Sequence, residues 1–312
     1  MQRREALARS AALVGAAVAS SSFSPTAEAA KPTDKSEPFG YCLNTSTIRG
    51  QGLGLVEEIE IAAKAGYRGI EPWLREIEQY LQAGGSLRDL RKRIVDAGLT
   101  VASAIGFAEW IVDDDAQRAK GLEQAKRDMG LIAELGGKFI AAPAAGAKDK
   151  HIDPLRAAER YRALCIVGDS AGVSPEVEVW GHSSTLGRLG EAVFVAIESG
   201  HPRACLLPDV YHLHKGGSDF QGLSLLAGSA MHCFHVNDYP DKPRDQLTDA
   251  DRVYPGDGVA PLATVFRTLA AIGFDGMLSL ELFNKSYWQQ DALTVARTGL
   301  EKTRAAVQKA LA

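Results

Sequence analysis

Strand-like and helix-like segments alternate along almost the whole chain, and this alternation is the strongest constraint on its fold. Short apolar runs rich in Val, Ile, Phe and Tyr are followed by longer segments with helical spacing of apolar residues. We predict strands at residues 39–48, 67–74, 100–107, 138–143, 176–180, 204–211, 231–236 and 277–282. We predict helices at residues 55–65, 87–97, 116–135, 154–171, 185–199, 261–272 and 291–311.

These units favour a single (β/α)8 TIM barrel, in which parallel strands close into a ring that is surrounded by helices. The connection after the sixth strand is the least regular one. A doubly wound open sheet is the alternative fold. That fold normally carries a glycine-rich dinucleotide-binding turn after its first strand, and residues 44–50 (Asn-Thr-Ser-Thr-Ile-Arg-Gly) do not form such a turn.

Residues 1–29 have the pattern of an export signal. Arg3 and Arg4 precede an apolar run from Ala11 to Ala19 that is too short to span a bilayer, and the segment ends in an Ala-x-Ala site at 27–29. The arginine pair favours the twin-arginine route, so we expect a processed protein in the periplasm. An N-terminal helix of the mature domain is the alternative. Cleavage would leave a short linker at 30–38 and the barrel at 39–312.

Composition excludes several classes of protein. With 46% hydrophobic and 24% charged residues, the 312-residue chain is neither a disordered, a collagen-like nor a polytopic membrane protein. A net charge of −4 provides no broad basic surface, so we expect no nucleic-acid partner and, after signal cleavage, no membrane association. The four cysteines lie in apolar segments without Cys-x-x-Cys spacing, so we predict buried free thiols at Cys42, Cys165, Cys205 and Cys233.

Titratable side chains mark the carboxyl ends of four consecutive predicted strands, the end where TIM barrels hold their active sites. They are Glu178, Asp209, His235 and Glu281. An acid in an apolar strand is costly to bury unless a cation compensates it, and one such residue per adjacent strand allows the four to converge. Three carboxylates and an imidazole suit a divalent metal ion such as Mn²⁺, Mg²⁺ or Co²⁺, with Zn²⁺ as a further option. Taken alone, each acid could instead pair with an arginine or cap a helix, and the histidine could fill the core.

These motifs resemble those of the xylose isomerase-like TIM barrels, a family of sugar isomerases and epimerases. The resemblance covers roughly residues 39–311. It implies that Glu178 and Glu281 are catalytic, both binding the metal and moving protons at the sugar's α-carbon from opposite faces. It also implies that His212 and Arg252 hold the substrate oxygens next to the carbonyl. The motifs that carry it are Glu178, Asp-x-x-His at 209–212, His-Val-Asn-Asp at 235–238, Arg252, Pro-Gly-Asp-Gly at 255–258 and Glu281.

The chain departs from this pattern in two places. The loop between Asp238 and Arg252 is long and charged, and residues 181–184 lack a second acid that some epimerases use there. The resemblance also allows a homo-oligomer, because family members often pair.

The chemistry expected of such a site follows from general principles. Removing a proton beside a carbonyl requires stabilisation of the enediolate oxygen, which a divalent ion chelating the adjacent oxygens provides. An epimerase needs proton-transfer groups on opposite faces, whereas an isomerase can use one base that serves both carbons. We therefore predict a metal-dependent sugar isomerase or epimerase. Its substrate would be an unphosphorylated monosaccharide or keto-sugar, because sugar phosphates are chiefly cytoplasmic. The alternatives are a metal-dependent lyase or hydrolase on keto-sugars, a nuclease and a non-catalytic sugar-binding barrel.

Further polar and aromatic residues at predicted strand ends are candidates for contacts with a small-molecule sugar. Glu71 is expected to bind a substrate hydroxyl or simply an arginine. Aromatic side chains can stack on the apolar face of a sugar or pack in the core, and the candidates are Trp73, Phe107, Trp110 and Trp180.

Overall fold

The computed structural model describes residues 37–312. The predicted export signal at 1–29 and most of the predicted linker at 30–38 lie outside the described residues. Within residues 37–312, no helix combines the length and the apolar character that a membrane span requires.

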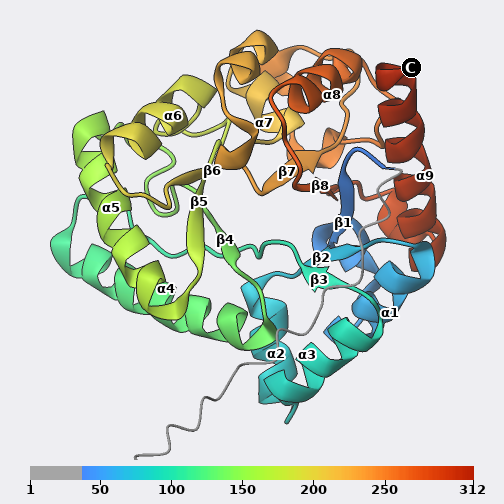
Figure 1. Ribbon diagram of the computed structural model, residues 1–312, viewed down its shortest axis with the longest axis horizontal. Helices are drawn as coiled ribbons and strands as arrows, with labels where there is room; N and C mark the ends of the chain where they lie inside the picture. Colours follow the sequence, from blue (N-terminus) through green and yellow to red (C-terminus); the bar gives the residue numbers. More distant parts are fainter. Residues whose placement is uncertain (1–36) are drawn as a thin grey trace, which may run out of the picture. The chain divides into compact units, whose positions relative to one another are not determined.

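Eight parallel strands form the centre of the molecule (Figure 1). Hydrogen bonds order them as β3-β2-β1-β8-β7 and as β4-β5-β6. The two sheets meet where Ala141 N donates to Ala104 O (2.8 Å) and where parallel bridges join Leu206 to Met231 and Asp209 to His235. The predicted (β/α)8 barrel is therefore confirmed. The strands are β1 (Gly40–Asn44), β2 (Gly69–Glu71), β3 (Thr100–Val101), β4 (Phe139–Ala142), β5 (Ser174–Glu178), β6 (Cys205–Leu207), β7 (Cys233–Val236) and β8 (Met277–Leu280).

The seven predicted helices are all present and surround the strands (Figure 1). Local sequence explains several of their ends. Asp153 caps α5 by accepting from Arg156 N (3.0 Å), and α1 and α4 end at Gly66 and Gly136, whose positive φ angles of 99° and 87° favour glycine. The outer helices are α1 (Leu55–Ala65), α3 (Leu87–Asp96), α4 (Asp115–Leu135), α5 (Pro154–Ala171), α6 (Leu189–Glu198), α8 (Leu262–Ala271) and α9 (Ala292–Leu311).

Two further helices replace the ends of predicted strands. The segment predicted as a strand at 67–74 contains only the three-residue β2, and α2 (Leu74–Gln82) follows it directly. The predicted strand at 204–211 likewise stops at Leu207, and α7 (Val210–Lys215) begins three residues later. Short 3-10 helices occupy the connections at η1 (Thr45–Gln51), η2 (Phe220–Leu225), η3 (Gly228–Ala230), η4 (Arg244–Gln246), η5 (Asp249–Asp251) and η6 (Tyr287–Gln289).

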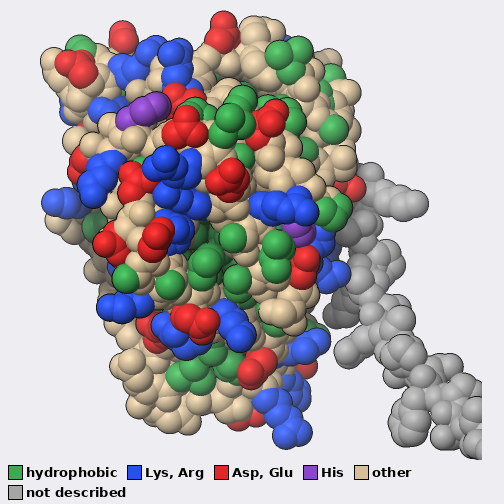
Figure 2. All heavy atoms as spheres, turned by 90° about the vertical axis from the view of Figure 1, so that its left-hand side faces the viewer, with side chains coloured by type: hydrophobic (Ala, Val, Ile, Leu, Met, Phe, Trp, Pro, Cys, Tyr) green, Lys and Arg blue, Asp and Glu red, His purple; other side chains and the backbone are tan. Residues whose placement is uncertain are grey.

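The main core fills the space between the strands and the helices, and all four cysteines are buried as free thiols, as predicted. The surface on the side of the molecule where α4 and α5 lie carries intermixed basic, acidic and apolar side chains (Figure 2). Single exposed apolar residues such as Leu155 and Ile166 on α5 are ordinary on a globular surface.

Candidate active site

The four predicted strand-end residues occupy equivalent places in the barrel. Glu178 is the last residue of β5, Asp209 follows β6, His235 lies in β7, and Glu281 follows β8. Each is at most 4% exposed. Because the strands are parallel, their carboxyl ends meet at one mouth of the barrel.

Asp209, His235 and Glu281 form a compact cluster whose ligand atoms all lie within 4.8 Å of one another. His235 Nδ1 is 3.5 Å from Asp209 Oδ2 and 3.4 Å from Glu281 Oε2. This nitrogen is buried and has no hydrogen-bond partner among the described residues, which is unusual for a polar atom unless a ligand belongs there.

Glu178 lies outside that three-residue group but shares its electrostatic environment. Burial raises the pKa of Glu178 well above its usual value, and Glu281 and Asp209 add to the rise while His235 opposes it. One cation, Arg252, compensates part of this charge, since its Nη1 lies 2.8 Å from Asp209 Oδ2 and 2.7 Å from Glu281 Oε2. The carboxylates of Glu178, Asp209 and Glu281 outnumber this guanidinium, and a donor set of carboxylate oxygens and an imidazole suits a divalent cation.

Glu71 differs from its predicted role. The residue is completely buried, and its carboxylate contacts His235 Nε2 at 3.1 Å from both oxygens. It also accepts from Ser279 Oγ (2.6 Å) and Asn44 Nδ2 (2.9 Å). These partners occupy the carboxylate, so it holds the His235 ring rather than a substrate hydroxyl or an arginine. A carboxylate behind a histidine is the usual way to orient a metal-binding imidazole.

The structure brings His212 and Arg252, which we call the oxygen-binding pair because they are predicted to hold substrate oxygens, to the cluster. Arg252 is only 1% exposed, and its Nη2 lies 3.1 Å from His212 Nε2 and 2.7 Å from Asp249 Oδ1. Burial disfavours the charge of Arg252, but Asp209, Asp249 and Glu281 outweigh this and raise its pKa. Burial lowers the pKa of His212 to about 3, so its ring is neutral.

The tautomer of His212 follows from its other contact. Gly181 N donates to His212 Nδ1 at 3.2 Å, so the neutral ring carries its proton on Nε2. The approach of Arg252 Nη2 to Nε2 therefore brings two donors together. An oxygen atom placed beside both nitrogens, within hydrogen-bonding distance of each, would accept from both of them.

Hydrogen bonds connect the two sequence motifs at residues 235–238 and 255–258. Asp238 Oδ2 accepts from the backbone N–H groups of Gly256 (2.9 Å) and Gly258 (3.1 Å), and Oδ1 accepts from Ala260 N (2.8 Å). Residue 258 has no room for a side chain, because a Cβ there would lie 2.2 Å from Tyr239 O. Together with the antiparallel bridge between Asp238 and Val253, these bonds fix the segment that carries Arg252.

Two polar residues of the site were not singled out from the sequence. Asn237 Nδ2 lies 3.2 Å from both oxygens of Asp209, while Asn44 at the end of β1 donates to Glu71 and, at 3.2 Å, to Glu281 Oε1. Both asparagines come directly after buried apolar strand residues, which is a signal visible in the sequence, and Asn237 belongs to the 235–238 motif.

Aromatic rings line the mouth above the cluster. Neighbouring ring centroids are 5.0–6.1 Å apart, and Arg252 completes the row between His212 and Phe283. We call this row the aromatic collar, and it consists of Phe283, Trp73, Phe107, Trp180, His182 and His212. Trp110 is not part of it. Its side chain is 1% exposed and its indole N–H donates to Pro143 O (2.8 Å), so Trp110 packs in the core. The prediction that it contacts the substrate is therefore wrong.

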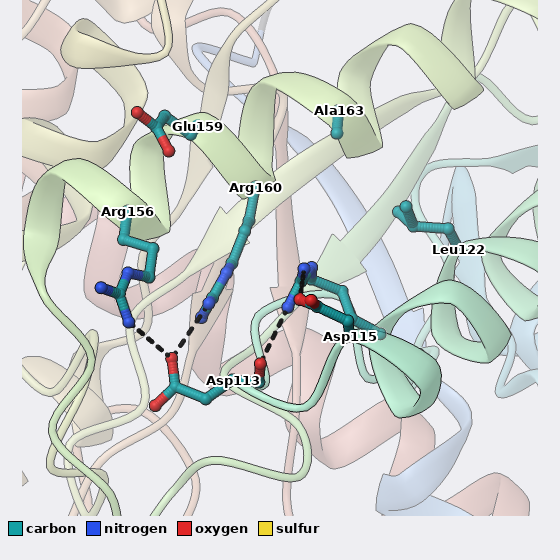
Figure 3. Close-up of a pocket in the computed structure, with 8 residues that line it drawn as sticks. Asp113, Asp115, Leu122, Arg156, Glu159, Arg160 and Ala163 are labelled. Carbon is teal, nitrogen blue, oxygen red and sulfur yellow. Dashed lines mark hydrogen bonds and ion pairs between the residues drawn. The ribbon is translucent and has the colours of Figure 1, made fainter.

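A separate hollow of about 400 Å³ lies on the outer surface between α4 and α5 (Figure 3). Asp113 there contacts Arg156 (3.3 Å) and Arg160 (2.9 Å), and Arg160 also donates to Ile111 O. Arg118 at the start of α4 pairs with Asp115. The charges of this hollow are largely used in fastening the loop before α4 to α5, which leaves the barrel mouth as the stronger site.

Comparison with known proteins agrees with the fold. The family model described as "Xylose isomerase-like TIM barrel" matches residues 59–306. An inosose isomerase of Halalkalibacterium halodurans is 32% identical over 273 residues, covering 86% of this chain and 96% of the relative. A 3-dehydroshikimate dehydratase of Pseudomonas aeruginosa is 28% identical over 273 residues, covering 82% of this chain and 41% of the relative.

Among solved structures, the IolI protein with a bound zinc atom superposes with a TM-score of 0.80 at 24% identity. The superposition covers 87% of this chain and 99% of that one. The chain therefore belongs to the xylose isomerase-like TIM barrel family and is an enzyme of the isomerase or epimerase type.

Proposed function

We propose that the protein is a metal-dependent isomerase or epimerase that moves a proton at the carbon next to a carbonyl of a keto-sugar. The observation that carries this proposal is the convergence of Asp209, His235 and Glu281, whose ligand atoms lie within 4.8 Å of one another, with His235 Nδ1 unpartnered among the described residues. Glu178, on the neighbouring strand β5, completes the set of charged groups.

The residues suited to hold a divalent ion are Glu178, Asp209, His235 and Glu281. When bound, such an ion would supply Lewis acidity to the oxygens beside the reacting carbon. Mn²⁺, Mg²⁺, Co²⁺ and Zn²⁺ are all compatible with the oxygen-rich donor set. Glu71 supports the set from behind, because it fixes His235 in the orientation that leaves Nδ1 facing the carboxylates.

The oxygen-binding pair positions the substrate. His212 Nε2 and Arg252 Nη2 are two donors 3.1 Å apart, and a carbonyl or hydroxyl oxygen beside them would accept from both. Arg252 also contacts Asp209 and Glu281, so an oxygen bound here lies beside the charged cluster.

Two carboxyl groups are placed to move the proton. Glu178 and Glu281 stand at the ends of β5 and β8, three strands apart around the barrel, so they approach the mouth from different sides. Burial raises the pKa of both, and a carboxyl whose pKa is shifted upward is better able to take and return a proton at neutral pH. Two such groups suit epimerisation, and either one alone suits isomerisation.

A deuterium-exchange experiment tests this proposal. The metal-loaded protein is incubated in D₂O with a panel of ketoses and keto-sugars, inososes included, and NMR detects deuterium at the α-carbon. We expect exchange with at least one compound. The Glu281→Gln variant should lose at least about 100-fold of the exchange rate, since proton transfer by a positioned side chain contributes on the order of 10²–10⁴-fold.

The Glu198→Gln variant is the matched control, because Glu198 is an exposed residue at the end of α6. Its exchange rate should equal that of the wild type. Absence of exchange with every compound of the panel, or full exchange in Glu281→Gln, contradicts the proposed function.

A metal-dependent lyase acting on keto-sugars is the second candidate, and the similarity to a 3-dehydroshikimate dehydratase favours it. Both reactions begin with removal of the same type of proton. The two differ in outcome, because a dehydratase forms a conjugated product with ultraviolet absorption. Exchange without new absorption therefore supports the isomerase or epimerase, and new absorption supports the lyase.

A further inference from the structure

A second cavity of about 400 Å³ opens beside the aromatic collar. The loops that follow β3, β4 and β5 form it, so it lies at the same mouth of the barrel as the cluster of Asp209, His235 and Glu281. Its volume falls within the range of about 300–1,000 Å³ that is usual for small-molecule sites. The aromatic and charged residues of its lining are Phe107, Glu109, Lys148, Asp149, Lys150 and Trp180.

Two aromatic residues belong to both the cavity and the collar. Phe107 and Trp180 have ring centroids 6.0 Å apart, and Trp180 follows Glu178 by two residues. The cavity therefore adjoins the aromatic collar, and Trp180 links it in sequence to Glu178. Phe107 is 39% exposed, a large share for a phenylalanine whose ring also packs against Trp73 at 5.3 Å.

The charges of the cavity are balanced. Lys148 and Lys150 face Glu109 and Asp149, and Glu109 Oε2 accepts from Gln117 Nε2 at 2.7 Å. A balanced set of donors and acceptors does not favour a phosphate or a carboxylate, but it suits a neutral ligand with many hydroxyl groups. Combined with two aromatic rings that can stack on apolar C–H faces, this lining matches a sugar ring.

We propose that this cavity is a second sugar subsite, which holds a glycosidic substituent while the keto-sugar ring occupies the metal-binding cluster. The substrate is then a keto-disaccharide or a related glycoside. This inference rests on the proposed function for the reacting ring. Binding of the second ring needs no turnover, so it can be tested on its own.

The test compares the affinity of disaccharides with that of their own monosaccharides. The full chain, loaded with Zn²⁺, is titrated with cellobiose, maltose, lactose, sucrose and trehalose and with glucose, galactose and fructose, using saturation-transfer NMR or calorimetry. We expect at least one disaccharide to bind about tenfold more tightly than either of its component sugars. If every disaccharide binds no more tightly than its monosaccharides, the second subsite is disproved.

Variants locate the effect. Phe107→Ala should reduce the ratio of disaccharide to monosaccharide affinity by about three- to tenfold, since one stacked aromatic ring is lost. Phe194→Ala on α6 is the matched control, because Phe194 is 38% exposed and lies outside the cavity, and its ratio should stay at the wild-type value. An unchanged ratio in Phe107→Ala would overturn the assignment even if disaccharides bind well.

The two proposals fail in different ways. Loss of all deuterium exchange with tight disaccharide binding would reject the proton-transfer function and keep the second subsite. Deuterium exchange with equal affinity for disaccharides and monosaccharides would do the reverse.

Discussion

Acidic side chains contact His235 on both of its ring nitrogens, and they act on it differently. Glu71 contacts Nε2, whereas Asp209 and Glu281 lie beside Nδ1. Burial disfavours the charge of His235, but Glu71 and Glu281 outweigh this and raise its pKa. Because Glu71 holds the proton on Nε2, Nδ1 is the nitrogen that a metal ion would bind in the proposed site.

Replacing Glu71 with glutamine tests this dependence. Glu71→Gln preserves the shape of the side chain but removes the charge that orients His235. We expect the affinity for Zn²⁺ or Mn²⁺ to fall about 10–100-fold, the usual effect of removing such a supporting carboxylate. Calorimetric titration of the metal-free protein measures it.

Glu58→Gln is the matched control for that experiment. Glu58 is also buried, at 2% exposure, but it belongs to α1 and has no contact with His235 within hydrogen-bonding distance. Metal affinity in this variant should stay within about twofold of the wild-type value. Equal losses in both variants would show that burial of an acid, and not its contact with His235, matters.

Individual site residues were predictable to different degrees. Asp209, His235 and Glu281 were identified because an acid or histidine at an apolar strand end is conspicuous in a sequence. Glu71 was conspicuous for the same reason, but its role depends on a histidine 164 positions away. Trp110 was misassigned because its burial depends on packing against Tyr161 and Pro143, contacts that its local sequence does not indicate.

At the scale of elements, the segment that carries Arg252 depends on one carboxylate. Asp238, the second residue after β7, accepts hydrogen bonds from the backbone N–H groups of residues 256, 258 and 260. Hydrogen bonds to a charged group contribute about 1.5–3 kcal/mol each, though neighbouring bonds are not additive. The loop therefore presents Arg252 to the cluster in one defined position.

Asp238→Ala is expected to loosen this loop. The free energy of unfolding should fall by about 2–4 kcal/mol, because buried N–H groups lose their acceptor. KM should rise more than kcat falls, since the role proposed for Arg252 is to bind a substrate oxygen through its positioned guanidinium. Chemical denaturation and steady-state kinetics measure the two effects.

Asp241→Ala serves as the control, because Asp241 is exposed and lies three residues further along the same loop. Its stability should change by less than about 0.5 kcal/mol, as is usual for surface substitutions. If Asp238→Ala has the stability and KM of this control, the carboxylate is not what positions Arg252.

Helices were predicted well where the segment with periodic apolar residues is long, and poorly where that segment is short. The helices α4, α5 and α9 span five or more turns each, and their apolar spacing and caps place them unambiguously. The helix α2 was not predicted, because its first residue was included in the predicted strand at 67–74 and the rest was left as a connection. Its sequence does carry helical signals, since Leu74, Ile77 and Leu81 have helical spacing and Glu76 accepts from Trp73 N. α7 has six residues, too few to show a period.

At the scale of the whole molecule, we propose that the chain is exported by the twin-arginine route. Arg3 and Arg4, the apolar run and the Ala-x-Ala site at 27–29 support this proposal. Export would separate the enzyme from most sugar phosphates, which favours an unphosphorylated substrate and agrees with the balanced charges of the proposed second subsite.

Cell fractionation and mass spectrometry test the export proposal. The full-length chain expressed in a bacterium with the twin-arginine system should appear in the periplasm with an N-terminus at residue 30. Replacing both Arg3 and Arg4 with lysine should retain it in the cytoplasm at its full length of 312 residues. Arg9→Lys, outside the pair, should be exported normally, and cytoplasmic retention of the unaltered chain would contradict the proposal.

The barrel, most of its helices and the strand-end residues of the cluster could be read from the chain alone. These features are local, because apolar periodicity, caps and a charged residue at a strand end are all visible within a few neighbouring positions. The contacts that those residues make with one another became apparent in the folded molecule. Glu71 proved to support His235, Trp110 proved to be core, and Phe107 and Trp180 were brought together beside a cavity, because these contacts join segments that are far apart in the chain.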